Sequence, residues 1–241
     1  MIEKLRGIVL QSIKYSDKNS IVKIFTDTYG NMSFFLPQGG GKVAKMRNAH
    51  FMPLSHIEFE ANILPGREIY GFRDVRLVYP FSSLYSDPVK NAIVMFITEL
   101  LGKVLNGSEQ NLGLFRYVST AVRLLDEIKM GTSNFHICFL YHLGSYLGVQ
   151  PNIEAYSDGY WFDMLNGDFT PMMPAHSHGL KPDDAKVIMM LSRISFSNLH
   201  HFKFSREQRN DVLDLMLKYY ELHNTTLSSL KSPEILKQLF R

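Results

Sequence analysis

The sequence contains a single cysteine, Cys138, among its 241 residues. One thiol cannot form a disulfide within the chain, which fits a reducing cytoplasm, where disulfides are rare. The neighbours of Cys138, in "HICFLYHL", are largely apolar. Because a thiol in apolar surroundings is rarely ionised, we expect a buried and inert side chain rather than a nucleophile.

Long hydrophobic runs are also absent. The first residues, "MIEKLRGIVLQS", contain no apolar stretch as long as that of a signal peptide, and "AIVMFI" at 92–97 is far too short to cross a bilayer. The apolar content of 45% and the charged content of 20% are typical of a packed globular protein. We therefore predict a cytoplasmic protein that does not bind a membrane.

Sequence patterns of catalysis are missing as well. We find no Gly-x-Ser-x-Gly, no paired-carboxylate pattern and no Cys/His arrangement. His176 and His178 stand near Asp163 and Asp168, but a His-x-His pair lacks the four-ligand pattern of a structural zinc site. We therefore expect solvent-exposed histidines, no bound metal, no cofactor and no enzymatic activity.

Negative charge is scarce near the amino terminus. Residues 1–80 carry 11 Lys and Arg against 7 Asp and Glu, whereas residues 81–241 carry 15 against 16. The first eighty residues are therefore basic in a chain whose net charge is only +3. This asymmetry favours an anionic partner for that region, although the charge alone does not identify the partner.

Five short segments before residue 80 are rich in β-branched and aromatic residues and predict strands. Turn residues separate them, and the fourth segment alternates Ile57, Phe59 and Ala61 with the polar His56, Glu58 and Glu60, as a half-buried strand does. The predicted strands cover residues 7–15, 20–27, 32–37, 54–62 and 69–79. Five short strands favour a small barrel or a sandwich. The longest break between them covers residues 38–53.

After residue 80 the apolar period becomes helical. Asp87 and Pro88 predict a capped helix that ends at Asn106–Gly107, and Ser205 and Gln208 form a capping box before a later helix. Further helices are predicted at about 109–129, 134–147, 183–195, 206–223 and 234–240. One segment interrupts the series, since residues 158–173 resemble a β-hairpin that turns at Leu165–Asn166–Gly167.

The segment "LPQGGGKVAKMRNAH" at 36–50 combines three glycines with Lys42, Lys45 and Arg47. It fails the Walker pattern at the first glycine and at the magnesium-binding hydroxyl. A dinucleotide fingerprint would have to open a long helix, which the strand that follows disfavours. Two interpretations stay open: a flexible surface loop, or a mobile basic loop that follows a nucleic-acid backbone.

Aromatic side chains in the strand region could stack on the bases of single-stranded nucleic acid. The candidates are Tyr15, Tyr29, Phe34, Phe35 and Phe51. Phe34 and Phe35 are adjacent on a strand, so one of them must face the core, and we expect most of these rings to be core residues. Tyr15 is the better stacking candidate because it stands at a strand end beside the polar "SDKN".

A series of patterns runs from residue 7 to residue 60. The stretches are "GIVLQSIKYSDKNSIVKIFTDTYGNMSFFLPQGGGK" and "FMPLSHIEFE". They contain, in order, a Gly-Ile-Val-Leu strand, a Tyr-x-Asp before a strand ending in Phe-Thr, a Gly turn, a glycine-and-lysine segment and a Pro-Leu strand. The carboxyl end contains "LMLKYYELHNTTLSSLKSPEIL". Together, these stretches resemble the RecO family of bacterial DNA repair and recombination mediators.

The resemblance implies an α+β fold, in which an amino-terminal five-stranded OB-fold β-barrel (1–80) precedes an all-α helical domain (81–241) with the hairpin inserted at 158–173. It implies a nucleoid-associated protein that binds single- and double-stranded DNA and anneals complementary strands in recombinational repair. The implied partners are RecR, the carboxyl-terminal tail of single-stranded-DNA-binding protein and, indirectly, the RecA recombinase that is loaded. The alternative is a protein-interaction scaffold with only weak DNA binding.

The chain departs from the family at one place. Many members carry a four-cysteine zinc module, but residues 148–180 contain no cysteine here and include "YWFDMLNGDF" instead. The aromatic residues Tyr160, Trp161, Phe162 and Phe169 could replace the zinc by burial, at about 1.5–3 kcal/mol per large side chain. We therefore do not extend the zinc site to this chain.

In an OB-fold, nucleic acid crosses the face of strands 2 and 3 and the adjoining loops. The resemblance and the positive charge together predict a set of DNA-contacting residues: Arg6, Lys14, Tyr15, Lys18, Lys23, Lys42, Lys45 and Arg47. We expect the loop cations to contact phosphates rather than bases, because cations replace counterions on the backbone whatever the base sequence.

Overall fold

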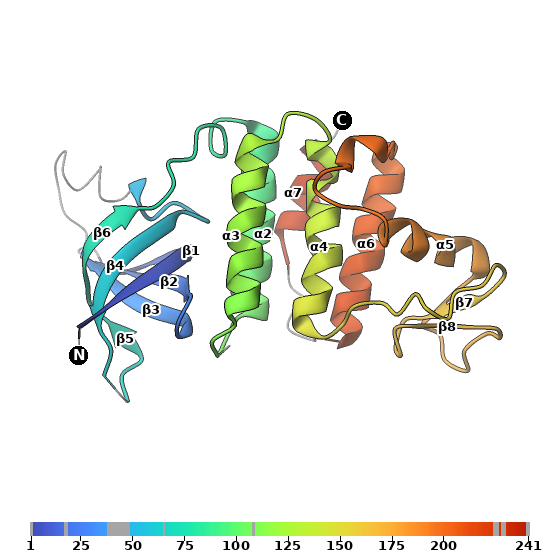
Figure 1. Cartoon of the computed structure of the whole chain (residues 1–241), viewed down its shortest axis with the longest axis horizontal. Coiled ribbons are helices and arrows are strands. Elements are labelled where there is room, and N and C mark those ends of the chain that lie inside the picture. Colours follow the sequence, from blue (N-terminus) through green and yellow to red (C-terminus); the bar gives the residue numbers. More distant parts are fainter. Residues whose placement is uncertain are drawn as a thin grey trace. The chain divides into compact units, whose positions relative to one another are not determined.

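The structure is a computed structural model that describes residues 2–16, 19–37, 49–64, 66–107, 109–223, 227 and 230–239 (Figure 1). Its contacts divide the chain into two compact units, Met1–Glu127 and Ile128–Arg241. The first unit contains β1 (Ile2–Ser16), β2 (Asn19–Thr26), β3 (Gly30–Pro37), β4 (His56–Asn62), β5 (Ile69–Tyr70), β6 (Phe72–Leu77), α2 (Pro88–Val104) and α3 (Leu112–Glu127). The second unit contains η1 (Thr132–Asn134), α4 (Phe135–Leu147), β7 (Trp161–Asp163), β8 (Asp168–Thr170), β9 (Gly179–Leu180), α5 (Pro182–Leu191), η2 (Leu199–His201), α6 (Arg206–His223) and α7 (Ser232–Leu239).

The six strands of the first unit form one curled sheet in the order β5-β3-β2-β1-β4-β6. β5 and β6 lie at opposite edges, yet Gly71 alone separates them along the chain. The two edges therefore meet at this glycine, and the sheet closes into a barrel. The predicted α+β fold with an amino-terminal OB-fold barrel is confirmed. The single strand predicted at 69–79 is divided, because its first half pairs with β3 and its second half with β4.

Alternation along the strands directs one face of the sheet into the barrel. Val22 and Ile24 of β2 and Phe34 of β3 are fully buried there, and the Phe34 ring lies 5.0 Å from that of Phe59 in an edge-to-face arrangement. The opposite, outer face is covered over only part of its area. On that face the paired residues Ile8 and Phe25 are fully buried, and the Phe25 ring lies 5.7 Å from Phe115 of α3. A helix therefore covers the middle of the outer face.

Both predicted helix caps are present. The Asp87 side chain accepts hydrogen bonds from the backbone N–H groups of Val89 (2.8 Å) and Lys90 (3.1 Å) at the start of α2. At α6, the Gln208 N–H donates to the Ser205 hydroxyl (3.1 Å) while the Ser205 N–H donates to the Gln208 side chain (2.9 Å). Each cap satisfies donors that the first helical turn leaves without a partner.

Asp126, near the end of α3, ties that helix to the segment before α2. Its carboxylate accepts hydrogen bonds from the backbone N–H groups of Ser82, Ser83 and Leu84. The buried Lys90 of α2 donates to the Asp126 backbone oxygen (2.7 Å) and to the Ser83 hydroxyl (2.8 Å). Three separate segments of the first unit therefore meet in one polar network. The chain boundary predicted at residue 80 passes directly before this network.

The second unit packs α4 against α6 and places β7 beside α5 (Figure 1). The predicted hairpin is present: β7 and β8 pair so that Phe162 opposes Phe169, with ring centroids 5.0 Å apart and both rings buried. Asp163 shapes the turn by accepting hydrogen bonds from the N–H groups of Leu165 and Asn166. A third strand, β9, was not predicted and pairs with the free edge of β7. No helix within the described parts of the chain is long and apolar enough to span a bilayer.

Candidate nucleic-acid interface

The outer face of β1, β2 and β3 carries two cross-strand rows outside the helix-covered region. One row is Gln11, Lys23 and Ser33, and the next is Ile13, Ile21 and Phe35. We call these six residues the strand face. Ile13 is 43% and Phe35 is 38% exposed, which is unusual for large apolar side chains on a sheet. The strand face therefore places a cation beside exposed apolar and aromatic surface.

Two further predicted residues lie near the end of this face. Tyr15 is 69% exposed and stands where the β1–β2 pairing becomes irregular. Lys14 pairs with Ser20, which is buried, so the pleat of the strand directs Lys14 to the side opposite Lys23. The structure therefore places Lys23 and Lys14 on different sides of the β1–β2 hairpin.

Arg6 lies on the outer face as well, but beyond the buried Ile8–Phe25 row. Its Nε is 3.8 Å from a carboxylate oxygen of Glu58 on β4. It also lines a groove between the sheet and α3. Arg6 and Lys23 therefore belong to separate surfaces. The sequence of the strands alone could not show this separation, because the helix between the two surfaces, α3, comes from a later part of the chain.

The remaining four predicted residues, Lys18, Lys42, Lys45 and Arg47, lie outside the described residues. Their contact with DNA stays a prediction.

The aromatic candidates divide as their positions on the strands require. Phe34 and Phe51 are buried in the barrel core, whereas Phe35, next to Phe34, faces outward. Tyr29 lies in the β2–β3 turn, at the end of the β2–β3 hairpin opposite to Phe35. It is 37% exposed, but its hydroxyl donates to the carboxylate of Glu3 in β1. Tyr15 and Phe35 are thus the aromatic rings available at the strand face.

The groups considered for chemistry have structural roles. Cys138 is fully buried, and burial raises the pKa of its thiol to about 12, so the thiol is protonated at neutral pH. His176 was expected in solvent, but its Nε2 lies 3.1 Å from Asp163, the residue that shapes the hairpin turn. Burial raises the pKa of Asp163, and the hydrogen bonds from Asn166, Leu165 and His176 lower it further than burial raises it. No group of three or more His, Cys, Asp or Glu side chains suited to a metal ion occurs within the described ranges.

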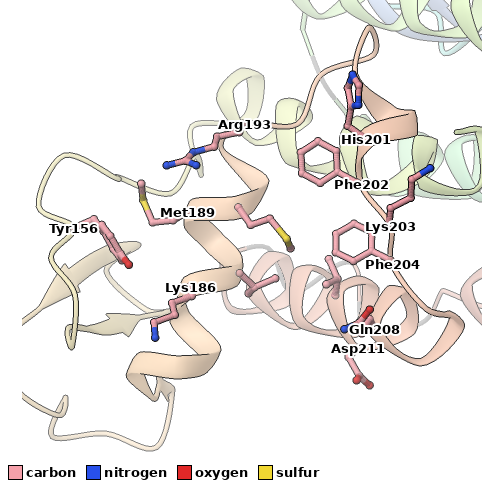
Figure 2. A pocket seen from close by; sticks show the side chains of 13 residues that line it. Tyr156, Lys186, Met189, Arg193, His201, Phe202, Lys203, Phe204, Gln208 and Asp211 are labelled. Carbon is pink, nitrogen blue, oxygen red and sulfur yellow. The ribbon is translucent and has the colours of Figure 1, made fainter.

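A second groove, in the second unit, lies between α5 and the segment that leads into α6. Its volume is about 780 Å³, and it is lined by Tyr156, Lys186, Val187, Met189, Met190, Arg193, His201, Phe202, Lys203, Phe204, Gln208, Asp211 and Val212. Figure 2 shows Phe202 and Phe204 pointing from their segment toward α5, with Lys203 between them pointing away. We call it the second-unit groove. It combines apolar walls with three cations and a single carboxylate.

Sequence reasoning missed several of these residues. Ile13 and Ile21 look like ordinary core positions in a strand, and only the cross-strand register shows that they share a face with Phe35. Arg116 and Arg123 on α3 line the groove beside Arg6, yet they fall in a region without net positive charge. A search for cations at helical spacing on α3 could have found this pair.

Comparisons with known proteins cover almost the whole chain. The family model described as "Recombination protein O N terminal" matches residues 1–81, and the one described as "Recombination protein O C terminal" matches residues 85–232. The chain is 39% identical over 240 residues to "DNA repair protein RecO" of Phocaeicola vulgatus and 36% identical over 241 residues to that of Bacteroides fragilis, with 100% of each chain covered. It is 31% identical over 238 residues to that of Flavobacterium psychrophilum, with 98% of each chain covered.

Proposed function

The chain belongs to the RecO family of DNA repair proteins, and we propose that it binds single- and double-stranded DNA and anneals complementary strands during recombinational repair. We propose further that it does this in the cytoplasm, and that it assists the loading of RecA together with RecR. Annealing needs no covalent chemistry. A basic surface that neutralises two strands lowers their mutual repulsion and raises their encounter rate.

The strand face is the observation that carries this proposal. Exposed apolar and aromatic side chains on a barrel are unfavourable in water, but nucleic-acid bases can cover them. Lys23 stands in the neighbouring row, where it can neutralise a phosphate. Tyr15, at the end of the hairpin, adds a ring with two thirds of its surface in solvent. Stacking on rings tolerates any base, which suits a protein that anneals strands of any sequence.

Fluorescence anisotropy with a labelled single strand over a series of salt concentrations tests this proposal. The double variant Tyr15→Ala/Phe35→Ala should weaken binding by at least about tenfold without changing the salt slope, because it removes stacking and no charge. Lys23→Gln should lower the slope by about 0.7. Tyr29→Ala is the matched control, since it removes an equally exposed ring at the opposite end of the hairpin.

Each outcome separates the candidates. If the full chain binds no DNA at moderate salt, the scaffold function replaces the DNA-annealing function. If it binds DNA but the Tyr15→Ala/Phe35→Ala variant binds as tightly as the wild type, the strand face is not the site. A fluorescence-quenching assay with complementary oligonucleotides then measures annealing itself.

The second-unit groove supports an acidic peptide partner, and we propose the carboxyl-terminal tail of single-stranded-DNA-binding protein. Phe202 and Phe204 offer apolar surface, and Arg193 and Lys203 offer positive charge beside it. Such a tail should bind the wild type and should lose affinity for Arg193→Gln/Lys203→Gln. Lys181→Gln/Lys218→Gln removes the same charge from exposed positions outside the groove and should bind like the wild type. Equal loss in both variants would contradict this site.

A further inference from the structure

One stripe of α3 is polar and basic where the rest of the helix is apolar. Arg116, Ser119, Thr120 and Arg123 are spaced by three, four and seven residues, which places them on one face of the helix. Arg116, Thr120 and Arg123 are exposed, and Ser119 is half-buried. All four line a groove of about 470 Å³ between α3 and the sheet, which we call the sheet–helix groove.

The opposite wall of this groove contains Arg6 of β1, His56 at the start of β4, and Tyr79. The Arg123 guanidinium lies 5.1 Å from the centre of the Tyr79 ring, and the Tyr79 hydroxyl donates to Glu127. The stacking holds the guanidinium over the ring without neutralising its charge. Arg116 has no ion-pair or hydrogen-bond partner among the residues that the structure describes.

Negative charge does not cancel these arginines. The lining of the groove contains three arginines and no carboxylate within the described chain. Three carboxylates stand beside the lining: Glu127 accepts from the Tyr79 hydroxyl (3.0 Å), Asp27 accepts from the Arg6 backbone N–H (3.3 Å), and Glu58 lies 3.8 Å from the Arg6 guanidinium but only 2.7 Å from the Lys4 ammonium. Lys4 offsets the charge of Glu58, and the lining itself carries a net positive charge.

His56 adds an unsatisfied polar atom to the wall. The sequence pattern assigned it to the polar side of its strand, but it is only 5% exposed and its ring lies edge-on to Phe81. Its Nε2 has no hydrogen-bond partner among the described residues. Buried polar atoms in folded proteins are nearly always paired, so His56 leaves one hydrogen-bonding position unused in the wall that also holds Arg6.

We propose that the sheet–helix groove binds the phosphate backbone of a second DNA strand. Guanidinium groups match phosphate with two parallel hydrogen bonds, and the hydroxyls of Ser119 and Thr120 can donate to the same oxygens. Arg116 and Arg123 are seven residues apart, which is about 10 Å along the helix. The Tyr79 ring already carries Arg123, and the other two rings of the lining, Phe115 and His56, are buried, so the groove suits a backbone rather than bases.

The inference rests on the proposed DNA-annealing function and adds a second strand to it. The strand face and the sheet–helix groove lie on the same sheet, on opposite sides of the buried Ile8–Phe25 row. α3, which contacts Phe25 through Phe115, stands between them. A first strand on the strand face is therefore kept apart from a second strand in the groove, and both strands are held by one unit.

The experiment measures how many short homothymidine oligonucleotides the full chain takes up, by native mass spectrometry and fluorescence titration. The wild type should bind two, and Arg116→Gln/Arg123→Gln should bind one. Removing two phosphate contacts from a single-strand site lowers its affinity about 25-fold at 0.1 M salt, from a slope of about 0.7 per contact. Annealing should slow in the same variant. Arg116→Lys/Arg123→Lys keeps the charge and should restore part of the loss, whereas Lys181→Gln/Lys218→Gln should behave like the wild type.

The outcomes keep this inference apart from the proposed function. If the wild type binds no oligonucleotide, both are wrong. If the wild type and Arg116→Gln/Arg123→Gln take up the same number, DNA annealing stands and the groove assignment is overturned. An acidic peptide that binds the wild type but not the variant, with oligonucleotide uptake unchanged, overturns it in favour of a protein ligand. The single variant Arg116→Gln changes an exposed side chain only, so its loss of uptake with an unchanged melting temperature cannot come from misfolding.

Discussion

Replacing Asp126 by alanine should destabilise the first unit by about 3 kcal/mol, because it leaves the N–H groups of the buried Leu84 and the half-buried Ser83 without an acceptor. The carboxylate accepts five hydrogen bonds. Its donors are the Ser82 N–H (3.0 Å) and hydroxyl (3.2 Å), the Ser83 N–H (2.7 Å) and hydroxyl (3.2 Å), and the Leu84 N–H (2.7 Å). Leu84 is fully buried, so water cannot replace the acceptor of its N–H.

Asp126→Asn is the matched comparison. Both of the shortest bonds, from the Ser83 and Leu84 N–H groups, end on Oδ1, and an asparagine keeps an oxygen there. The charge and the bonds to Oδ2 are lost, so we expect destabilisation by about 1–2 kcal/mol. With a denaturant dependence of about 1.5–2 kcal/mol per molar urea, a loss of 3 kcal/mol in the alanine variant moves the midpoint of unfolding by about 1.5–2 M.

Urea unfolding followed by far-UV circular dichroism measures this shift. The chain has one tryptophan, Trp161, which belongs to the second unit, so its fluorescence reports on that unit separately. The dichroism midpoint should fall in the order wild type, Asp126→Asn, Asp126→Ala. If Asp126→Ala lowers the free energy of unfolding by less than about 1 kcal/mol, the network contributes no more than an ordinary surface hydrogen bond and the reasoning is wrong.

The same carboxylate makes stability depend on pH. Burial raises the pKa of Asp126, but the hydrogen bonds from Ser82, Ser83 and Leu84 lower it more, so the folded-state pKa lies below 3.8. A lowered carboxylate pKa stabilises the fold above the unfolded-state value, and this contribution disappears as the pH falls through the folded-state value. The difference in stability between wild type and Asp126→Asn should therefore be constant above about pH 5 and shrink below pH 4.

Three further predictions concern metal, loop and histidine. Because residues 148–180 contain no cysteine, purified protein should contain no stoichiometric zinc, and a chelator should leave the melting temperature unchanged; a clear drop contradicts this. Removing the charges of Lys42, Lys45 and Arg47 should lower the salt slope of single-strand binding by about 2, as anisotropy over a salt series would measure. Burial, with a smaller effect of Arg209, lowers the pKa of His136 to about 3, so this residue is neutral in the folded state. Its protonation should therefore lower the free energy of unfolding by about 1.4 kcal/mol for each pH unit below 6.5. Urea unfolding at a series of pH values measures this slope, and its absence would show that His136 is not held neutral in the folded state.

Local patterns predicted the elements whose residues carry their own signal. The Asp87–Pro88 start of α2 and the Ser205–Gln208 capping box depend on side chains within four residues of the helix start, and both are present. The hairpin at 158–173 depends on apolar residues beside a glycine turn, and Phe162 opposes Phe169 as required. Such features need no contact with a distant segment, which explains why sequence alone is sufficient for them.

Features that depend on a distant partner were missed. β1 begins at Ile2 rather than at residue 7, because Lys4 and Arg6 are held in the sheet by pairing with Glu60 and Glu58 of β4. Because Lys4 and Arg6 are charged, the local sequence pattern does not indicate a strand at these residues. His56 was placed on the polar side of its strand for the same reason, and it is buried. Neighbours contributed by another strand or helix decide burial at these positions.

A cut after residue 80 would divide the first compact unit of the chain, so it is not a suitable test of which part binds DNA. A truncation that removes residues 1–80 would expose Phe115, which is 9% exposed in the full chain and packs on Phe25. It would also divide the arginines of one groove between two fragments. The compact unit that ends at Glu127 carries 15 Lys and Arg against 12 Asp and Glu, whereas residues 128–241 carry 11 of each.

The informative cut therefore follows Glu127. The fragment 1–127 keeps the whole barrel, the Asp126 network and both basic surfaces, so it should bind a labelled single strand with a salt slope close to that of the full chain. The fragment 128–241 has no net charge and should bind weakly, because phosphate binding scales with the number of cations that replace counterions. Anisotropy titrations of both fragments, each first checked for a cooperative melting transition, measure the difference. If residues 128–241 alone bind DNA as tightly as the full chain, the positive surfaces of the first unit are not where the backbone is held.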